Sequence, residues 1–533
     1  MPLPEENTVW PPRNHGSICN EYRVWSAWYE GDREALARVY GGAGSSPYGP
    51  ATQFFGSEHG DRISQYRGGV VGAVARWFWG QPLRPEQRSP KLHVPLAADI
   101  ASISANLLFG DEPSVTVEDQ ATQERLDELL DETTWGEILN GAEICAGLGG
   151  VFLRVAWDQD VDQRPLLSVI GPDVAVPVFK WCRLNEVTFY WVLERGDKNQ
   201  VLRHLEHHSV GQVEHALYLG DDDSIGRRVP ITEHTDTAGL VDSLNEDGVI
   251  PTGLDRLDVV YVKNAPNRRW RNHPIGQGLG QPDISGVEPM LDALDETYTS
   301  WMRDLRLAKT RIVVPQNQLE NAGPGQGASF DMDREVFVGM NALVIDGMPV
   351  NLVQPNIRDQ EHARTAAALV ERAISDSGYS IQTFGLTGDI AMTATEAIAR
   401  ERKTYQTRNG KIRRWRPALA DLIELMLMID ASVFGSSVQP IKPDIEFAPI
   451  ARDNMEALAR TSTLLRSAEA ASTETLVRMN HPEWDQDQID EELLKIAADS
   501  AIPNPDTGFT GQNPADNSTA PATSPASSGA GEY

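Results

Sequence analysis

The longest unbroken apolar period in this chain constrains its fold more than any other feature. Between residues 287 and 308, apolar side chains recur with the i, i+3, i+4, i+7 spacing of one helix face. The members of this stripe are Val287, Met290, Leu291, Leu294, Tyr298, Trp301, Met302, Leu305 and Ala308. Ser285 and Glu288 form an S-x-x-E capping box at its start. We therefore predict an amphipathic rod roughly 33 Å long, which packs its stripe against a second rod.

Two further helices follow along the chain, after an expected strand at RIVVP (311–315) and a glycine-rich loop at 321–329. The first follows Pro355 and ends at Gly378, a residue suited to a helix C-terminus. Its apolar face consists of Ala363, Ala366, Val370 and Ile374. The second has a capping box from Thr393 to Glu396 and continues into the apolar stretch 419–429. We expect Pro417 to kink it.

The hydrophobic pattern divides the remaining chain into helical and β-rich parts. Short helices are predicted around Trp25 and Trp28, in 91–113, and in two stretches between 124 and 148. From Val151 to Tyr218, short β-rich runs separated by Gly, Pro and Asp predict a meander of strands. Asp221 to Gly253 is acidic and rich in turn residues, so we expect an exposed loop. A strand at 443–449 and helices at 454–467 and 487–497 precede a polar tail at 501–533, which composition predicts to be disordered.

Charge and cysteine content exclude several classes of protein. The chain has 533 residues, with 77 acidic and 47 basic side chains and a formal net charge of -30. A surface that grips nucleic acid tightly carries the opposite sign, whereas an acidic surface lets DNA pass without sticking. Cys19, Cys145 and Cys182 lie far apart, so neither a disulfide framework nor a zinc ribbon is indicated. No signal peptide is recognisable, and the apolar run at 422–429 is too short to span a bilayer.

Two glycine patterns resemble nucleotide-binding motifs but lack their essential parts. The Gly410-Lys411 pair has Tyr405 in place of the first glycine of a phosphate loop and Ile412 in place of Ser or Thr. This argues against a packaging ATPase of that class. The G-x-G-x-G run at 276–280 follows a strand but opens no βαβ unit, so we interpret it as a flexible turn.

The stretch around residue 206 is the one candidate for a metal site. His204, Glu206 and His208 share one face of a predicted strand, and His207 lies on the other. Two histidines and a carboxylate could hold zinc. No fourth ligand is identifiable, and alternating polar residues on a half-exposed strand explain the run equally well.

A basic helix stands out in this acidic chain. Between residues 396 and 416 only two acids accompany eight basic side chains, which are Arg400, Arg402, Lys403, Arg408, Lys411, Arg413, Arg414 and Arg416. A solvated helix face, pairing with acidic neighbours across a subunit interface, and contact with DNA all remain open. The many carboxylates in the flanking chain favour pairing.

The ordered series of segments resembles the portal proteins of tailed bacteriophages, of the siphovirus type in phages of actinobacteria. The segments include HVPLAADIASISANLLFGDEP (93–113), GGVFLRV (149–155), PDVAVPVF (172–179) and RHLEHHSVGQVEHALYLG (203–220). The helical stretches 288–315 and 393–427 and the C-terminal stretch 445–493 continue the series. The resemblance covers nearly the whole chain except the tail, and it lies in the order of segments because portals have no catalytic signature.

The resemblance implies an α+β portal fold, mostly helical with a β-rich wing and clip, which assembles as a ring of twelve subunits. Its parts would be a wing (1–281), a stem helix (282–308), a clip (309–356), a second stem helix (357–377), a tunnel loop (378–392), a long kinked helix (393–436), a crown (437–500) and a tail (501–533). Stem packing would involve Leu291, Leu294, Tyr298, Trp301, Met302 and Leu305. The channel-facing tunnel loop would comprise Ile381, Gln382, Thr383, Phe384, Gly385, Leu386 and Thr387.

The implied function is structural, with no enzyme activity, metal or cofactor. Double-stranded DNA would pass through the ring during packaging and ejection. The expected partners are the terminase large subunit, the major capsid protein, the scaffolding protein and the head-tail adaptor, with no membrane. The chain would be made in the host bacterial cytoplasm and reside at the portal vertex of the virion. Another minor virion or adaptor protein is the alternative, and a metal-dependent hydrolase at residues 204–208 is a weaker one.

Overall fold

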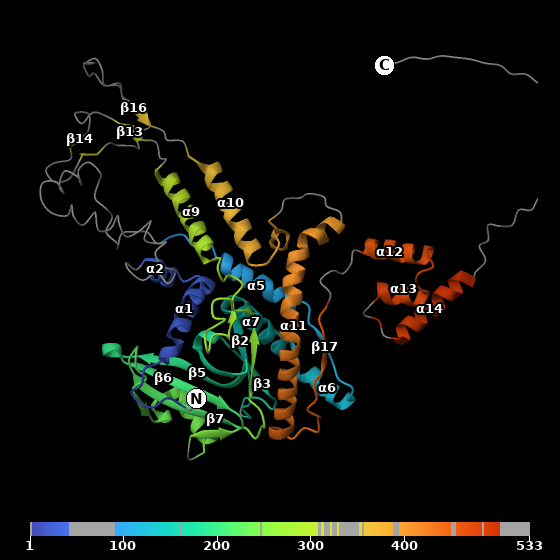
Figure 1. Cartoon of the computed structure of the whole chain (residues 1–533), viewed down its shortest axis with the longest axis horizontal. Coiled ribbons are helices and arrows are strands. Elements are labelled where there is room, and N and C mark those ends of the chain that lie inside the picture. The colour runs from blue at the N-terminus through green and yellow to red at the C-terminus, as the bar shows by residue number, and fades with distance from the viewer. Residues whose placement is uncertain are drawn as a thin grey trace, which may run out of the picture. The chain divides into compact units, whose positions relative to one another are not determined.

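The computed structural model forms two compact units, Met1–Ile450 and Ala451–Tyr533. It describes residues 3–41, 91–159, 161–245, 248–307, 311–313, 320–321, 328–329, 351–353, 357–386, 394–448, 455–481, 484 and 486–501. Figure 1 shows the first unit as helices packed around two separate antiparallel sheets. The mixture of helix and sheet confirms the predicted α+β class.

The main core of the first unit forms around α11 (Ala394–Val433), the 40-residue helix drawn in orange in Figure 1. Its apolar stretch between 419 and 429 is buried against α5 (Leu96–Phe109), α7 (Glu132–Leu148) and a three-stranded sheet. That sheet has the order β10-β2-β3, with strands Val259–Lys263, Gly150–Ala156 and Leu166–Ile170. The helix continues through Pro417 without interruption, and the kink expected there stays a prediction.

The meander predicted between residues 151 and 218 is confirmed, although it is divided between two sheets. The larger sheet has the order β4-β5-β6-β7-β8, and β9 also pairs with β7. Its strands are Ala175–Lys180, Arg183–Arg195, Val201–Ser209, Gln212–Gly220, Arg227–Val229 and Val249–Pro251. Because β8 and β9 both pair with β7, the expectation of a plain loop from Asp221 to Gly253 was wrong. That segment also contains the one-turn helix α8 (Thr235–Ala238).

The tryptophan-rich N-terminal helices are α1 (Gly16–Glu30) and α2 (Arg33–Gly41). Trp25 is fully buried, packs against Trp270, and donates a hydrogen bond from Nε1 to Glu288 Oε1 at 3.0 Å. This contact joins the N-terminus to the beginning of α9, more than 250 residues away. Asp119 and Asp131 cap α6 (Gln120–Leu129) and α7 by accepting hydrogen bonds from backbone N–H groups.

Two small pairings complete this region. β1 (Ser114–Thr116) pairs with β17 (Asp444–Glu446), which confirms the strand predicted near residue 445. β11 (Ala265–Pro266) pairs with β12 (Gly280–Gln281). The glycine run at 276–280 is closely packed rather than a flexible turn, since a Cβ on Gly280 would lie 1.8 Å from the Gly149 carbonyl oxygen. The run therefore serves close backbone packing.

The two predicted rods are present as α9 (Glu288–Leu307) and α10 (Asp359–Asp376). The capping box does not form as expected, because Ser285 belongs to the preceding turn and the Glu288 carboxylate accepts from Gly286 N at 2.6 Å. Gly378 follows α10 with φ +99°, as expected for a helix C-terminus. Between the rods, β13 (Arg311–Val313) pairs with β16 (Asn351–Val353), and β14 (Glu320–Asn321) with β15 (Ala328–Ser329).

The second unit consists of the helices α12 (Met455–Ser467), α13 (Thr473–Asn480) and α14 (Gln486–Ala501). The first and last of these were predicted. α13 was missed, although Ser472 signals its start by accepting a hydrogen bond from Thr475 N. The predicted disordered tail lies outside the described residues beyond Ala501.

Candidate functional site

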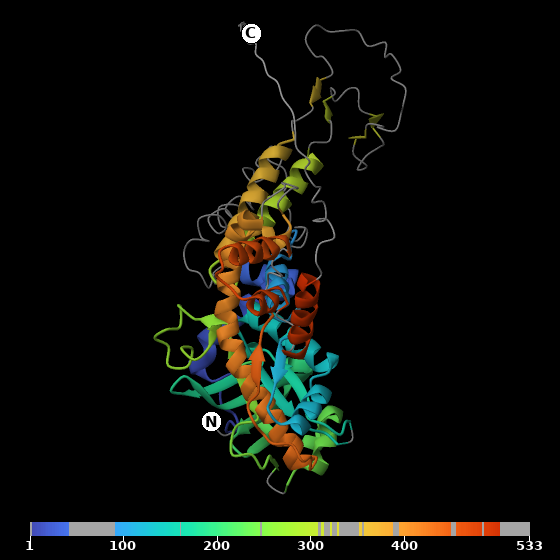
Figure 2. The same cartoon turned by 90° about the vertical axis from the view of Figure 1, so that its right-hand side faces the viewer.

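The helices α9 and α10 lie side by side as an antiparallel pair, as both views show (Figures 1 and 2). At the end of the pair nearest the sheets, Leu291 and Leu294 are buried against Ala366 and Ile374 in one cluster. Burial falls along α9, so that Tyr298, Trp301 and Met302 are half-buried and Leu305 is 40% exposed. The predicted stem-packing residues therefore form one stripe, but a single chain covers only its first half.

Polar contacts join the far ends of the two helices. Asp304 accepts hydrogen bonds from Arg358 Nη2 at 2.8 Å and from His362 Nε2 at 3.0 Å. These hydrogen bonds from His362 and Arg358 lower the pKa of Asp304. The Trp301 ring stacks on His362 with the ring centres 6.1 Å apart. The pair is thus held together by polar contacts where apolar burial is weakest.

A buried polar cluster lies where the helix pair meets the rest of the unit. Asp283 Oδ2 accepts from Lys411 Nζ at 2.6 Å and from the Tyr379 hydroxyl at 2.7 Å. The same ammonium contacts Ser104 Oγ at 2.6 Å. The side chains of Lys411 and Asp283 are each 6% exposed, and burial raises the pKa of Tyr379 well above its usual value. Four segments are fixed together by this cluster: α5, α11, the turn before α9 and the chain after α10.

The predicted tunnel loop begins at this cluster. Its first part is a short 3-10 helix, η9 (Ile381–Phe384), rather than the irregular loop expected. Ser380 N donates to Thr404 Oγ1 on α11 at 2.9 Å, and the Thr383 and Thr404 hydroxyls are 2.9 Å apart. Ile381 and Phe384 pack against the core that α9 and α10 share, whereas Gln382 is half-buried. These contacts with α11 hold the segment in a defined conformation, although its own sequence has no helical period.

Exposure begins at the glycine that ends η9. Gly385 has φ +66°, and Leu386 after it is 57% exposed. Thr387, the last predicted member of the loop, lies outside the described residues. The assignment of this segment to a channel stays a prediction.

The basic stretch of α11 is divided between the interior and the surface. Arg408 is buried and donates to the Leu107 and Ala448 carbonyls, at 2.5 and 2.6 Å. Burial lowers its pKa. Lys403 donates to the Ser375 carbonyl, and Arg414 donates to the Gly410 carbonyl at 2.8 Å. The buried Arg408, the half-buried Arg414 and the exposed Lys403 therefore bind backbone oxygens of their own chain. Among the four cations, Lys411 alone pairs with a described carboxylate.

Besides Lys403, the exposed members of the basic stretch are Arg402, Arg413 and Arg416. Arg413 and Arg416 line an open cavity of about 460 Å³ together with Asn409, Ile412 and Pro417. The side chain of Arg400 lies outside the described residues. These exposed cations remain available for a neighbouring subunit or for DNA.

The histidine-rich strand β6 is buried on both faces, so the expectation of a half-exposed strand was wrong. His204, Glu206 and His208 share one face as predicted, and Arg154 from β2 reaches Glu206 at 2.5 Å. His208 donates from Nδ1 to Asp258 Oδ2 at 2.8 Å and from Nε2 to Glu206 Oε1 at 2.6 Å. Although burial opposes the charge, Asp258 and Glu206 raise the pKa of His208 to about 9.

The remaining histidines of this region are held in the neutral form. His204 Nε2 lies 3.2 Å from His215 Nδ1, and the two rings stack. Burial lowers the pKa of His204, and it lowers that of His215 to about 4. On the opposite face, His207 Nδ1 lies 2.9 Å from Thr188 Oγ1, and burial lowers its pKa to about 4.

These contacts leave the proposed zinc ligands engaged with each other. Both nitrogens of His208 already contact carboxylates, and the Glu206 carboxylate binds Arg154. In the described part of the chain, no group of three His, Cys, Asp or Glu side chains could hold a metal ion. The arrangement is a buried ion-pair network that joins two sheets, and the hydrolase hypothesis loses its main motive.

Several residues of the polar cluster at the base of the helix pair were missed from the sequence. Ser104, Asp283 and Tyr379 lie far apart along the chain, and none belongs to a motif. Lys411 was noticed as one of eight basic residues and in the rejected phosphate-loop pattern, but not as a buried partner of Asp283. Tyr379 carried a weak signal as an aromatic residue directly after the helix-ending Gly378.

Comparison with known protein families matches residues 14–502 to the model "Phage portal protein, SPP1 Gp6-like". This chain belongs to the SPP1 Gp6-like portal family. The resemblance seen in the sequence is thereby confirmed, and with it the role of a phage portal, a head-tail connector of the virion. A portal is a structural protein and not an enzyme.

Two solved structures match this chain at low similarity. The neck of an empty GTA particle, computed with C6 symmetry, has 14% identity and a TM-score of 0.38, over 78% of this chain and 94% of that chain. The neck of a native GTA particle, computed with C12 symmetry, has 14% identity and a TM-score of 0.35, over 76% and 92%. Comparison with curated proteins gives no match. Among the described residues, no helix is long and apolar enough to cross a membrane.

Proposed function

We propose that twelve copies of this chain form a closed ring at one capsid vertex, through which double-stranded DNA enters and leaves. The observation that carries this proposal is the half-covered stripe of α9. Tyr298, Trp301 and Met302 continue the apolar face but are only half-buried, although Trp301 stacks on His362 of α10. Leu305 beyond them is 40% exposed. An apolar stripe left open on a rod pair suits contact with an identical neighbour, and repetition of that contact closes a ring.

In this proposal each subunit divides as the family resemblance implies. Residues 1–281 form the wing, α9 and α10 the stem, 309–356 the clip, 378–392 the tunnel loop, 393–436 the long helix and 437–500 the crown. The clip docks the terminase large subunit during packaging and then the head-tail adaptor. The major capsid protein and the scaffolding protein surround the ring during assembly.

The charge of the chain supports passage of DNA rather than a grip on it. With a net charge of -30, an assembled ring repels a phosphate backbone over most of its surface. The docking of η9 on α11 supports a tunnel loop whose base is fixed and whose exposed part begins at Gly385. Movement of DNA would then meet an adjustable segment held on a rigid frame.

The mass and shape of the purified particle test the ring. Twelve chains of 58.7 kDa give a particle of about 704 kDa with a central hole. Light scattering and negative-stain imaging measure both, and a ring of eleven or thirteen subunits would also agree. A chain that remains monomeric with scaffolding and capsid protein present would contradict the proposal.

Deletion of residues 381–389 tests the tunnel loop separately. The deletion removes η9, so the assembled ring must first be confirmed by imaging. We expect rings that form but package DNA poorly. Unimpaired packaging by such rings would remove the loop assignment and leave the ring proposal intact.

A further inference from the structure

The turn between β4 and β5 presents an unusual pair of residues. Lys180 pairs with Arg183, so Trp181 and Cys182 form a two-residue hairpin turn. Both have positive φ, at 52° and 61°. Turns of this type favour Asn and Gly because those residues adopt positive φ with little strain. A tryptophan in this position is not explained by the needs of the turn.

The fold of the single chain does not explain the tryptophan either. Trp181 is 98% exposed, the most exposed of the large hydrophobic side chains that the structure describes. Two positions before it, Phe179 packs on Tyr261 with ring centres 5.6 Å apart and lies against Gly278. The base of the hairpin is therefore anchored, while its tip holds an indole ring out into solvent. Exposed, rigidly held aromatic side chains are typical anchors of protein interfaces.

The surroundings of the indole are basic in a strongly acidic protein. Lys180 and Arg183 flank it, and Lys263 on β10 lies close enough to Cys182 to interact with the thiol. Lys263 Nζ donates to the Gln277 carbonyl at 2.8 Å. Throughout the described ranges, no salt bridge joins a carboxylate to any of these three cations, although Lys180 interacts electrostatically with Glu186 on β5. The tip therefore has a surplus of positive charge beside its apolar anchor.

A complementary acidic surface lies on the same chain around α6. Its exposed carboxylates are Glu118, Glu124, Asp127, Glu128 and Glu132. The one arginine of this helix, Arg125, is already engaged by Asp430 at 2.9 Å and by Glu128 at 2.7 Å. The α6 face therefore keeps a surplus of negative charge.

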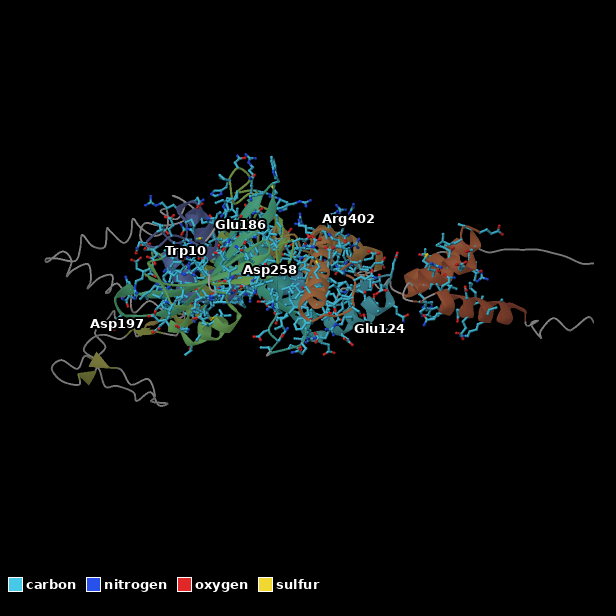
Figure 3. The ribbon with its side chains drawn as sticks, turned by 90° about the horizontal axis from the view of Figure 1, so that it is seen from below. Trp10, Glu124, Glu186, Asp197, Asp258 and Arg402 are labelled. Atoms are coloured by element: carbon cyan, nitrogen blue, oxygen red, sulfur yellow. The ribbon has the colours of Figure 1, made fainter. Side chains whose placement is uncertain are left out.

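The basic tip and the acidic face lie on different sides of the unit. Figure 3 shows Glu124 of α6 on one side, Glu186 of β5 on the other, and the buried Asp258 between them. Glu186 lies four positions after Cys182, the second residue of the turn. Two complementary surfaces placed in this way cannot meet within one chain. They can meet between copies, in the head-to-tail manner that a closed ring requires.

We propose that the β4–β5 hairpin docks on the α6 face of the next copy of this chain, with Trp181 as its apolar anchor and Lys180, Arg183 and Lys263 facing the carboxylates. This inference rests on the proposed ring, because it names one contact between neighbouring subunits. It adds a wing contact to the contact expected along the α9 stripe.

The exposed Cys182 thiol provides a direct test of the contact. Glu118→Cys, Glu124→Cys and Asp127→Cys are made one at a time in the full chain, and assembled rings are oxidised mildly. A disulfide forms only where the two Cα atoms come within about 7 Å. We expect at least one variant to give a ladder of linked chains on a denaturing gel.

Two controls separate this contact from chance collisions. Cys182→Ser combined with the linking variant should abolish the ladder, whereas Asp197→Cys, on another exposed turn, should give none. Rings that assemble normally but show no ladder with any of the three variants would overturn the inference and leave the ring standing. A wild-type chain that never forms rings would instead contradict the proposed function.

The contribution of the anchor is measured by assembly of Trp181→Ser. Because the indole touches little of its own chain, the variant should fold normally, as circular dichroism can show. We expect half-assembly to need about tenfold more protein. Val210→Ser, at the exposed β6–β7 turn, is the matched control and should assemble as wild type. Unchanged assembly of Trp181→Ser would overturn the inference. If such rings also retained DNA less well, the tip would be assigned to a contact with DNA.

Discussion

Two carboxylates in this protein have the same kinds of partner in opposite surroundings. Glu206, in the sheet region, contacts Arg154 at 2.5 Å and His208 at 2.6 Å. Asp304, at the far end of the helix pair, contacts Arg358 at 2.8 Å and His362 at 3.0 Å. The first network is buried, with His208 1% exposed, whereas Arg358 in the second is 68% exposed.

The difference in burial decides what each network can do. In the interior, charges interact strongly, and removal of one partner leaves another without solvent or counter-charge. At the surface, water and salt replace a lost partner at little cost. The buried network therefore fixes the relative positions of two sheets, while the contacts of the surface network can be rearranged at little cost.

The largest expected loss of stability comes from removal of the histidine of the buried network, and removal of the histidine of the surface network is its comparison. His208→Ala should lower the free energy of unfolding by about 3–5 kcal/mol, because it leaves Asp258 and Glu206 as buried carboxylates with one arginine between them. His362→Ala is the matched variant and should lower it by about 1 kcal/mol or less. Urea unfolding followed by circular dichroism measures both. Equal losses of unfolding free energy in the two variants would contradict the view that burial decides the contribution of each network.

The dependence of stability on pH should identify the buried network. Because the pKa of His208 is raised to about 9 in the folded chain, its contribution is complete below its unfolded pKa of about 6.5. That contribution, on the order of 3 kcal/mol, is lost as the pH rises from about 6.5 to 9. His208→Gln should flatten this alkaline limb of the stability profile, and a persisting limb would assign it to other groups.

The acidic limb of the same profile should come from the neutral histidines. Burial lowers the pKa of His207 and His215 to about 4, so the unfolded chain binds more protons between about pH 6.5 and 4. Stability should therefore fall as the pH is lowered through that range. His215→Gln, which cannot be protonated, should weaken the fall, whereas the alkaline limb should remain.

The smallest effect is expected at the carboxylate of the surface network. Asp304→Ala should lower the free energy of unfolding only slightly, and the loss should shrink further at high salt. Asp376→Ala, which removes the Arg372 pair within α10 alone, is the control for a surface ion pair that joins no helices. A large loss for Asp304→Ala alone would show that the far end of the helix pair is more rigid than its exposure implies.

The helices and most strands could be predicted because their signals are local. Each signal lies within one segment of the sequence. Examples are the apolar period of α9, the glycine that follows α10 and the β-rich runs between residues 151 and 218. The short strands β8 and β9 were missed because their pairing with β7 comes from a partner distant in sequence.

The candidate site was predicted less completely than the fold. The apolar stripe of α9 could be predicted from its helical period, but the sequence could not show that full burial ends before Tyr298. The basic stretch of α11 was recognised as a unit, yet the structure turns Arg408 and Lys411 inward and leaves Arg413 outside. A helix places successive residues about 100° apart, so a charge run in sequence is not a charged face in space.

By itself, the sequence determined the family, the order of the elements and the acidic balance, since each depends on residue types and their order along the chain. Only the tertiary structure decided which charges are buried. Asp283 and Lys411 lie 128 residues apart and meet at 2.6 Å, and Trp181 is exposed although it follows an apolar strand. The physical reason is that burial and charge pairing depend on contacts between distant segments, which local periodicity does not encode.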